Sequence, residues 1–223
     1  MKNILILEDH DIVRMGLKFL IKENFNSMNV RDVENSELCI KYLRESEIFD
    51  LLIIDLRIPG MEPTLFIQNI IAEFPHTKII IFTAMSSEVY AKYYYTLGVR
   101  AFLNKAEITN NEIVKAIDFV LSNKIYIPES LSLSLNTRLF RNEIKNNKNP
   151  FDSLSQKELT VLDSLLKGES ISSISKSLNN HPSTIGTFKA RIFNKVGVKN
   201  LIELKNTYDL YFQNDKALNI SIN

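Results

Sequence analysis

The chain has 223 residues, of which 45% are hydrophobic and 24% are charged, the composition of an ordinary globular protein. No apolar run approaches the ~18 residues of a membrane-spanning helix, so we expect a cytoplasmic protein without a membrane partner. The net charge of +1 hides a division, because residues 1–122 carry 13 basic and 17 acidic side chains whereas residues 151–208 carry 8 and 5. An acidic first part suits a bound cation, and a basic second part suits a polyanion.

The first part of the chain alternates strands and helices. Apolar runs predict strands at residues 3–7, 28–33, 49–54, 78–83 and 101–103. Helical periodicity predicts helices at 11–22, 36–46, 64–73, 86–97 and 110–122, and the first of them places Ile12, Met15, Phe19 and Leu20 on one face. Parallel strands need crossover connections, so this alternation predicts an α/β doubly wound five-stranded parallel sheet over residues 1–122.

Residues that carry chemistry follow four of these strands. Glu8 and Asp9 come after the first strand, Asp55 after the third, Thr83 at the end of the fourth, and Lys105 after the fifth. The carboxyl ends of parallel strands meet at one edge of a sheet. Carboxylates gathered there favour Mg²⁺, which prefers oxygen ligands, and a hydroxyl and an ammonium group suit a phosphoryl group. Taken singly, Asp55 fits a turn cap equally well, but the ordered set favours a site.

Residues 123–150 are predicted to be a linker. The segment 141–150 is rich in Asn and Lys and ends at Pro150. In residues 128–140, alternating Leu and Ser fit either a short helix or a strand, so both readings stay open.

Four helices are predicted in residues 151–208. Ser155 begins a capping box, Ser170 caps the second helix, and the third runs from Pro182 to about Val196 before Gly197. A fourth helix is expected at 200–208, followed by a C-terminal tail, 209–223, that is partly disordered or a short extension. This order predicts a smaller all-α helix-turn-helix domain whose third helix enters the major groove of DNA.

The first part resembles the receiver domain of two-component response regulators, which has a flavodoxin-like fold. The resemblance rests on LILEDHDIVRMGL, IIDLRIPGM, IIIFTAM and AFLNK, and it spans residues 1–122. It implies that a sensor histidine kinase phosphorylates Asp55. It further implies that Mg²⁺ is held by Glu8, Asp9, Asp55 and the backbone carbonyl of Arg57, that Thr83 and Lys105 bind the phosphoryl oxygens, and that Phe102 is the switch aromatic.

The segment LSQKELTVLDSLLKGESISSISKSLNNHPSTIGTFKARIFNKVGVKNLIEL is similar to the LuxR-type DNA-binding domain, so the whole chain resembles a NarL/FixJ-type response regulator. The resemblance implies a transcription regulator that binds double-stranded DNA as a homodimer, on half-sites about one helical turn apart. It implies that DNA contacts come from Thr184, Thr187, Lys189, Ala190 and Arg191, and that Phe188, Ile192 and Val196 lie in the core. The run from 181 to 199 holds no acid, which adds Lys195 and Lys199 as expected phosphate contacts.

Some residues depart from the family pattern. Glu8 stands where Asp is more usual, and Glu62-Pro63 stands where Gly is usual, so the loop beside Asp55 is expected to be reshaped. In the third helix of the second part, Gly186 and Phe188 replace a common Lys and His, so the base preference of relatives does not transfer.

Two alternatives accompany this interpretation. One is a regulator that binds DNA independently of phosphorylation, an alternative that the changes at Glu8 and Pro63 leave open. A Mg²⁺-dependent phosphatase with Asp55 as nucleophile is the enzyme alternative, but such enzymes generally place a second acid two residues later, where this chain has Arg57.

Overall fold

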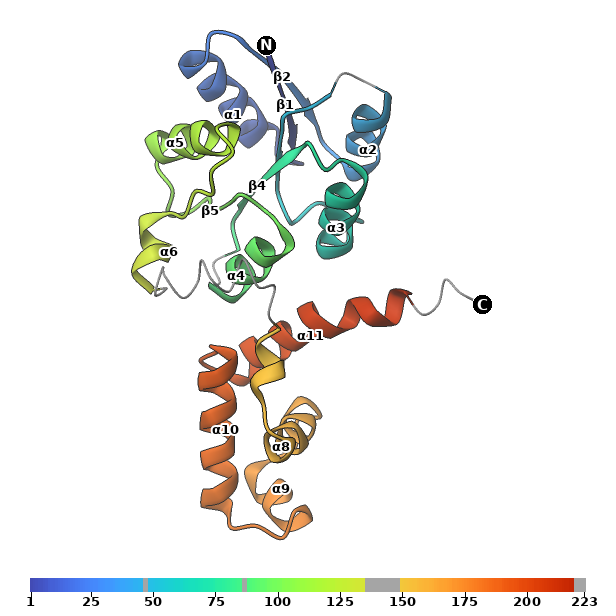
Figure 1. The fold of residues 1–223 in the computed structure, drawn as a ribbon, viewed down its shortest axis with the longest axis vertical. Helices are drawn as coiled ribbons and strands as arrows, with labels where there is room; N and C mark the ends of the chain where they lie inside the picture. Colours follow the sequence, from blue (N-terminus) through green and yellow to red (C-terminus); the bar gives the residue numbers. More distant parts are fainter. Residues whose placement is uncertain (46–47, 86–87, 135–148, 219–223) are drawn as a thin grey trace. The chain divides into compact units, whose positions relative to one another are not determined.

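The structure, a computed structural model, describes residues 1–45, 48–85, 88–134 and 149–218. The chain divides into two compact units, residues 1–146 and 147–223, which we describe separately (Figure 1). Within the described ranges, no helix is both long and apolar enough to cross a membrane.

The first unit is a five-stranded parallel sheet in the order β2-β1-β3-β4-β5, which confirms the predicted doubly wound fold. The strands are β1 (Lys2–Leu7), β2 (Met28–Val33), β3 (Leu51–Ile54), β4 (Lys78–Thr83) and β5 (Ala101–Asn104). The helices between and after them are α1 (Asp11–Asn24), α2 (Ser36–Glu45), α3 (Pro63–Glu73), α4 (Glu88–Leu97) and α5 (Asn110–Leu121). Helices α1 and α5 lie on one face of the sheet, and α2 and α3 lie on the other (Figure 1).

The face that α1 buries differs from the apolar face predicted for it. Leu17 and Ile21 are the buried residues of α1, and of the predicted face only Leu20 packs partly buried against the core. Ile12, Met15 and Phe19 are 85%, 69% and 68% exposed. The prediction failed because α1 carries apolar residues on two faces, and only packing against the sheet decides between them. Helix α1 therefore leaves an apolar surface uncovered, which we call the α1 patch (Ile12, Met15 and Phe19).

The loop beside Asp55 is organised by the two residues that depart from the family pattern. Pro63 occupies the first turn of α3, where its missing N–H and fixed φ are tolerated. Glu62 is the N-cap, and its carboxylate accepts backbone hydrogen bonds from Thr64 (3.4 Å) and Leu65 (2.5 Å). Glu62-Pro63 therefore forms an ordinary helix start.

The chain after α5 stays attached to the first unit. Asn123 ends α5 with a positive φ of 62°, and the Tyr126 N–H donates to the Arg100 carbonyl at 2.9 Å. Of residues 128–140, Glu129–Ser134 form helix α6, while 135–148 lie outside the described residues. The first residues of the predicted linker are thus held beside the sheet.

The second unit consists of a short 3-10 helix, η1 (Pro150–Ser153), and helices α8 (Gln156–Leu166), α9 (Ile171–Ser177), α10 (Pro182–Val196) and α11 (Leu201–Leu218). The capping box of Ser155 with Glu158 is present, and Gly197 ends α10 with a φ of 78°. Ile185, Ile192 and Val196 form the buried side of α10.

Helix α11 extends ten residues beyond the predicted end of the fourth helix. Tyr208, at the predicted end, and Tyr211 and Phe212, in the added turns, have ring centroids 5.3 to 6.1 Å from that of Phe151. These aromatic contacts bury part of the segment that had been predicted as a tail, and such long-range packing extends a helix that its own polar sequence does not favour. Residues 219–223 lie outside the described residues.

Candidate functional site

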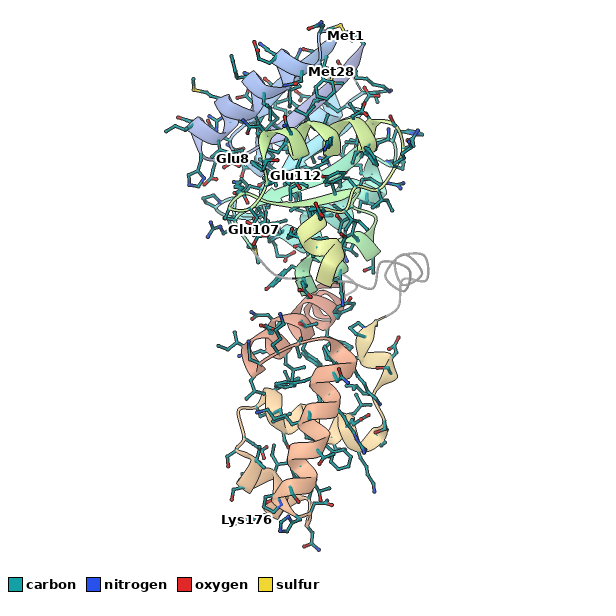
Figure 2. The ribbon with its side chains drawn as sticks, turned by 90° about the vertical axis from the view of Figure 1, so that its left-hand side faces the viewer. Met1, Glu8, Met28, Glu107, Glu112 and Lys176 are labelled. Carbon is teal, nitrogen blue, oxygen red and sulfur yellow. The ribbon has the colours of Figure 1, made fainter. Side chains whose placement is uncertain are left out.

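The predicted acidic site lies at the carboxyl edge of the sheet, and its polar side chains are buried. Glu8, Asp55 and Thr83 are 1%, 2% and 0% exposed, and Glu8, labelled in Figure 2, directly follows β1. The sheet hydrogen bonding continues past the strand ends, because the Asp55 N–H donates to the Leu7 carbonyl at 2.9 Å. The backbone therefore fixes Glu8 and Asp55 on neighbouring strands.

Lys105 joins the two buried carboxylates. Its Nζ lies 2.6 Å from Glu8 Oε2 and 2.6 Å from Asp55 Oδ2, and its backbone N–H donates to the Thr83 carbonyl at 2.8 Å. Only 16% of the Lys105 side chain is exposed. One ammonium group thus pairs with two buried carboxylates, so a net negative charge remains.

Asp55 is held in its charged form. Burial raises the pKa of its carboxyl, but the hydrogen bond and charge of Lys105, together with hydrogen bonds from Thr83 and the Arg57 backbone, lower the pKa below its ordinary value. Asp55 is consequently a carboxylate at neutral pH, the form in which it can attack a phosphorus atom.

Four side chains at this edge can approach one cation. Ligand atoms of Glu8, Asp9, His10 and Asp55 all lie within 4.8 Å of one another. The three carboxylates are the oxygen donors that Mg²⁺ prefers, and the negative charge left by Lys105 fits a divalent cation. The Arg57 N–H donates to Asp55 Oδ1 at 3.2 Å, while the role of its carbonyl as a ligand stays a prediction.

Two residues near the acidic pair were not predicted. His10 Nδ1 lies 2.9 Å from Asp9 Oδ1 and 3.1 Å from Glu8 Oε1, and its position directly after the pair was a usable signal. Arg14 donates from Nη1 to the Glu8 backbone carbonyl at 2.7 Å and from Nε to Asp32 at 3.0 Å. Arg14 thus ties the loop after β1 to β2, a long-range contact that no local pattern indicates.

Phe102, the expected switch aromatic, points into the protein. It is 4% exposed and stacks on Tyr94 with a centroid distance of 6.2 Å and an interplanar angle of 19°. The Tyr94 hydroxyl lies 3.4 Å from Thr64 Oγ1 at the start of α3. Phe102 therefore belongs to a packed contact that joins β5, α4 and α3.

In the second unit, the predicted DNA-contacting residues divide by exposure. Thr187, Ala190 and Arg191 are exposed on the side of α10 opposite its buried residues. Thr184 and Lys189 are half-buried, and Lys189 Nζ lies 5.3 Å from the centre of the Phe193 ring. Thr187, Ala190 and Arg191 therefore form the exposed face of α10 that is available to contact the major groove of DNA.

Lys195 is bound within the second unit. Its Nζ donates to Glu158 Oε2 at 2.7 Å and to the Ser153 carbonyl at 2.9 Å. The hydrogen bond from Lys195 and the backbone bond from Ser155 lower the pKa of buried Glu158 to about 2. Sequence reasoning missed this ion pair because the run around Lys195 contains no acid, and its partner Glu158 lies on α8, 37 residues earlier. Lys199 lies outside α10 and is exposed.

Two family models match the chain. The response regulator receiver domain matches residues 4–118, and the luxR family of bacterial regulatory proteins matches residues 152–206. The Fimbriae Z protein of Salmonella typhimurium strain LT2 is 32% identical over 203 residues, which cover 91% of this chain and 93% of that protein. Response regulator UvrY of Escherichia coli strain K12 is 26% identical over 204 residues, which cover 92% of each.

Solved structures of RcsB are similar over nearly the whole chain. One, of two RcsB dimers bound to two parallel DNAs, gives a TM-score of 0.77 at 28% identity and covers 94% of this chain and 98% of that one. Another, RcsB from Salmonella enterica serovar Typhimurium bound to promoter P1flhDC with the phosphomimetic BeF3-, gives 0.72 at 27% identity with the same coverage. This chain belongs to the NarL/FixJ-type two-component response regulators, with a receiver domain followed by a LuxR-type DNA-binding domain.

Proposed function

We propose that the chain is a cytoplasmic transcription regulator whose binding to double-stranded DNA is controlled by phosphorylation of Asp55 by a sensor histidine kinase. The observation that carries the proposal is the buried, charged Asp55 carboxylate, 2.6 Å from Lys105 at an edge that also holds Glu8, Asp9 and Thr83. These groups match the needs of phosphoryl transfer, in which positioning and charge stabilisation supply most of the catalysis.

In the proposed reaction, an Asp55 carboxylate oxygen forms a bond to phosphorus as the bond from phosphorus to the kinase histidine nitrogen breaks. Lys105 then balances the charge of the phosphoryl group, and the Thr83 hydroxyl donates a hydrogen bond to one of its oxygens. Glu8, Asp9, Asp55 and the Arg57 carbonyl would hold Mg²⁺, which would supply the remaining positive charge at the phosphoryl group.

A phosphodonor experiment tests this step. Incubation with acetyl phosphate and Mg²⁺ is expected to add one phosphoryl group to the protein, as measured by intact mass. Asp55→Asn is expected to add none. The exposed residue Asp163→Asn is the matched control and is expected to behave as wild type. A wild-type mass that does not change, or that changes equally in Asp55→Asn, contradicts the proposal.

For DNA, we propose that α10 enters the major groove with the face formed by Thr187, Ala190 and Arg191. Support comes from the exposure of this face and from the packing of α10 on α8 and α9 in helix-turn-helix order. Thr184, Lys189 and Lys199 are proposed to contact flanking phosphates. Lys195 is proposed to stabilise the fold of the second unit and so to affect DNA binding indirectly, because its Nζ already donates to Glu158 and to the Ser153 carbonyl.

Salt dependence separates these roles. Lys189→Ala is expected to weaken binding to all DNA sequences alike and to reduce the salt slope by about 1, as loss of one phosphate contact requires. Arg191→Ala is expected to cost about 1–3 kcal/mol if the side chain reads a base, with relaxed sequence preference. Lys205→Ala, an exposed change on α11, is the control. A changed preference with an unchanged slope in Lys189→Ala contradicts its phosphate role.

We further propose that the regulator acts as a homodimer that covers the α1 patch. Ile12, Met15 and Phe19 repeat at helical spacing and are all more than two-thirds exposed, which is unusual for contiguous apolar side chains on a monomer. Gly16 lies among them, and a Cβ added there would meet nothing within 4 Å, so a second backbone has room to approach. Support also comes from the RcsB dimers named above.

Sedimentation tests the dimer. Phe19→Glu is expected to shift the phosphorylated protein toward monomer, because a charge would be buried in an apolar contact. Ile48→Glu, which changes an equally exposed apolar residue outside the α1 patch, is expected to leave the distribution unchanged. Equal effects of the two variants would place the contact elsewhere.

A further inference from the structure

Tyr95 connects three segments of the receiver through one buried hydroxyl. The residue lies on α4 and is 1% exposed. Its hydroxyl oxygen accepts the backbone N–H of Phe102 at 3.1 Å, and its O–H donates to the backbone carbonyl of Tyr126 at 2.7 Å. A single atom thus joins α4, strand β5 and the segment that follows α5.

Phe102 and Tyr126, the two hydrogen-bond partners of the Tyr95 hydroxyl, lie in the two segments that the hydroxyl joins to α4. Phe102 is the expected switch residue and pairs in the sheet with Ile81, two residues before Thr83. Tyr126 lies in residues 123–128, the exit segment, which connects α5 to α6 on the way to the second unit. The Tyr126 N–H donates to the Arg100 carbonyl at 2.9 Å, and its ring meets Phe119 edge to face at 5.8 Å.

The Tyr95 hydroxyl and the exit segment each bond one backbone group on the outer side of β5 or of the residue before it. Because β5 is the last strand of the sheet, its outer backbone groups have no neighbouring strand to bond. The Tyr95 hydroxyl oxygen accepts the N–H of Phe102, and the Tyr126 N–H donates to the carbonyl of Arg100. Packing alone would be satisfied by a ring without a hydroxyl, so the two hydrogen bonds are the specific contribution of Tyr95.

We propose that Tyr95 is a positioning residue that couples the phosphorylation site to the exit segment. The inference rests on the proposed function. Thr83 and Lys105 lie at the carboxyl ends of β4 and β5. A phosphoryl group on Asp55 that binds both side chains therefore favours one position of β5 and of the loop between β4 and α4. The hydroxyl can keep both hydrogen bonds only while α4, β5 and the exit segment hold one arrangement. A change at Asp55 therefore alters the exit segment through Tyr95.

The first test needs no phosphorylation. Tyr95→Phe keeps the ring and removes the hydroxyl, and amide hydrogen exchange in the full chain is expected to quicken by about 3- to 10-fold at both Phe102 and Tyr126. Tyr126→Phe changes the same exit segment but keeps the carbonyl that Tyr95 binds, and exchange at Phe102 is expected to stay unchanged. Faster exchange at Phe102 alone, or at neither amide, in Tyr95→Phe overturns the coupling.

The second test measures the response to phosphate. In wild type, acetyl phosphate with Mg²⁺ is expected to raise DNA affinity by a factor within the range of about 5 to 150 that is typical of coupled sites. In Tyr95→Phe the phosphoryl stoichiometry by mass is expected to be unchanged while this ratio falls toward one, and in Tyr126→Phe the ratio is expected to be retained. A full ratio in Tyr95→Phe overturns the inference. A wild-type ratio of one contradicts the proposed function instead, and the amide measurement then decides the coupling alone.

Discussion

Lys105 is the shared ion-pair partner of two buried carboxylates, so its removal should have a large and specific cost. Lys105→Met keeps most of the side-chain length but leaves Glu8 and Asp55 at 1% and 2% exposure without their shared cation. Removing one partner of a buried ion pair costs about 3–5 kcal/mol, and the partial exposure of Lys105 favours the lower end. With a urea m-value of about 2 kcal/mol/M, a loss of about 3 kcal/mol lowers the unfolding midpoint of the receiver by about 1.5 M.

Two conditions should restore much of this stability. Mg²⁺ at 100 times its dissociation constant adds about 2.7 kcal/mol to any form that binds it only when folded. Acid should also help the variant, because without the hydrogen bond and charge of Lys105 burial raises the pKa of the Asp55 carboxyl, and protonation then removes an unpaired charge. In wild type the sign is opposite: the Asp55 pKa is lowered, so its stabilising contribution is present above the unfolded-state pKa and is lost as the pH falls.

The assay is urea-dependent hydrogen exchange of the β3 and β4 amides in the full chain, which reports the receiver without the second unit. Lys115→Met on α5, where the side chain is exposed, is the matched control and is expected to behave as wild type. Adding Asp55→Asn to Lys105→Met is expected to recover stability by removing one unpaired charge. A Lys105→Met receiver that is as stable as wild type without Mg²⁺ at neutral pH would refute the charge-balance reasoning.

Three further outcomes follow from the second unit. The lowered Glu158 pKa means that its ion pair with Lys195 stabilises the unit above the unfolded-state pKa, so stability should fall as the pH drops toward 2, and Glu158→Gln should flatten that dependence in thermal melts. Gly186→Ala should stabilise the unit by about 0.5–1 kcal/mol in urea, because an added Cβ meets nothing within 4 Å and glycine is a poor helix former. Phe151→Ala should cost about 3 kcal/mol and reduce helical circular dichroism, since it removes the ring on which Tyr208 and Phe212 of α11 pack.

The sheet and the helix starts were predictable because their signals are local. The run that ends at Asp55 is buried at every position of β3, and the capping box at Ser155 needs only residues three apart. The residues of the acidic edge were predictable for a related reason: parallel strands bring their carboxyl ends together whatever the helices between them do.

The features that were missed depend on contacts between distant segments. The sheet buries Leu17 and leaves Phe19 exposed, although both fit a helical stripe. The partner of Lys195 comes from α8, and the hydrogen bonds of the Tyr95 hydroxyl run to β5 and to the exit segment. A pattern of residue types within one helix carries no information about which distant backbone or carboxylate will meet it.

The central claim is that phosphate on Asp55 controls DNA binding, and one comparison tests it most directly. DNA affinity is measured at fixed salt for wild type and Asp55→Ala, each with and without acetyl phosphate and Mg²⁺. We predict that the phosphodonor raises the affinity of wild type and leaves Asp55→Ala unchanged. Equal affinities of wild type in the two conditions, with the phosphoryl group shown to be present by mass, would contradict the account and favour a regulator that binds DNA independently of phosphorylation.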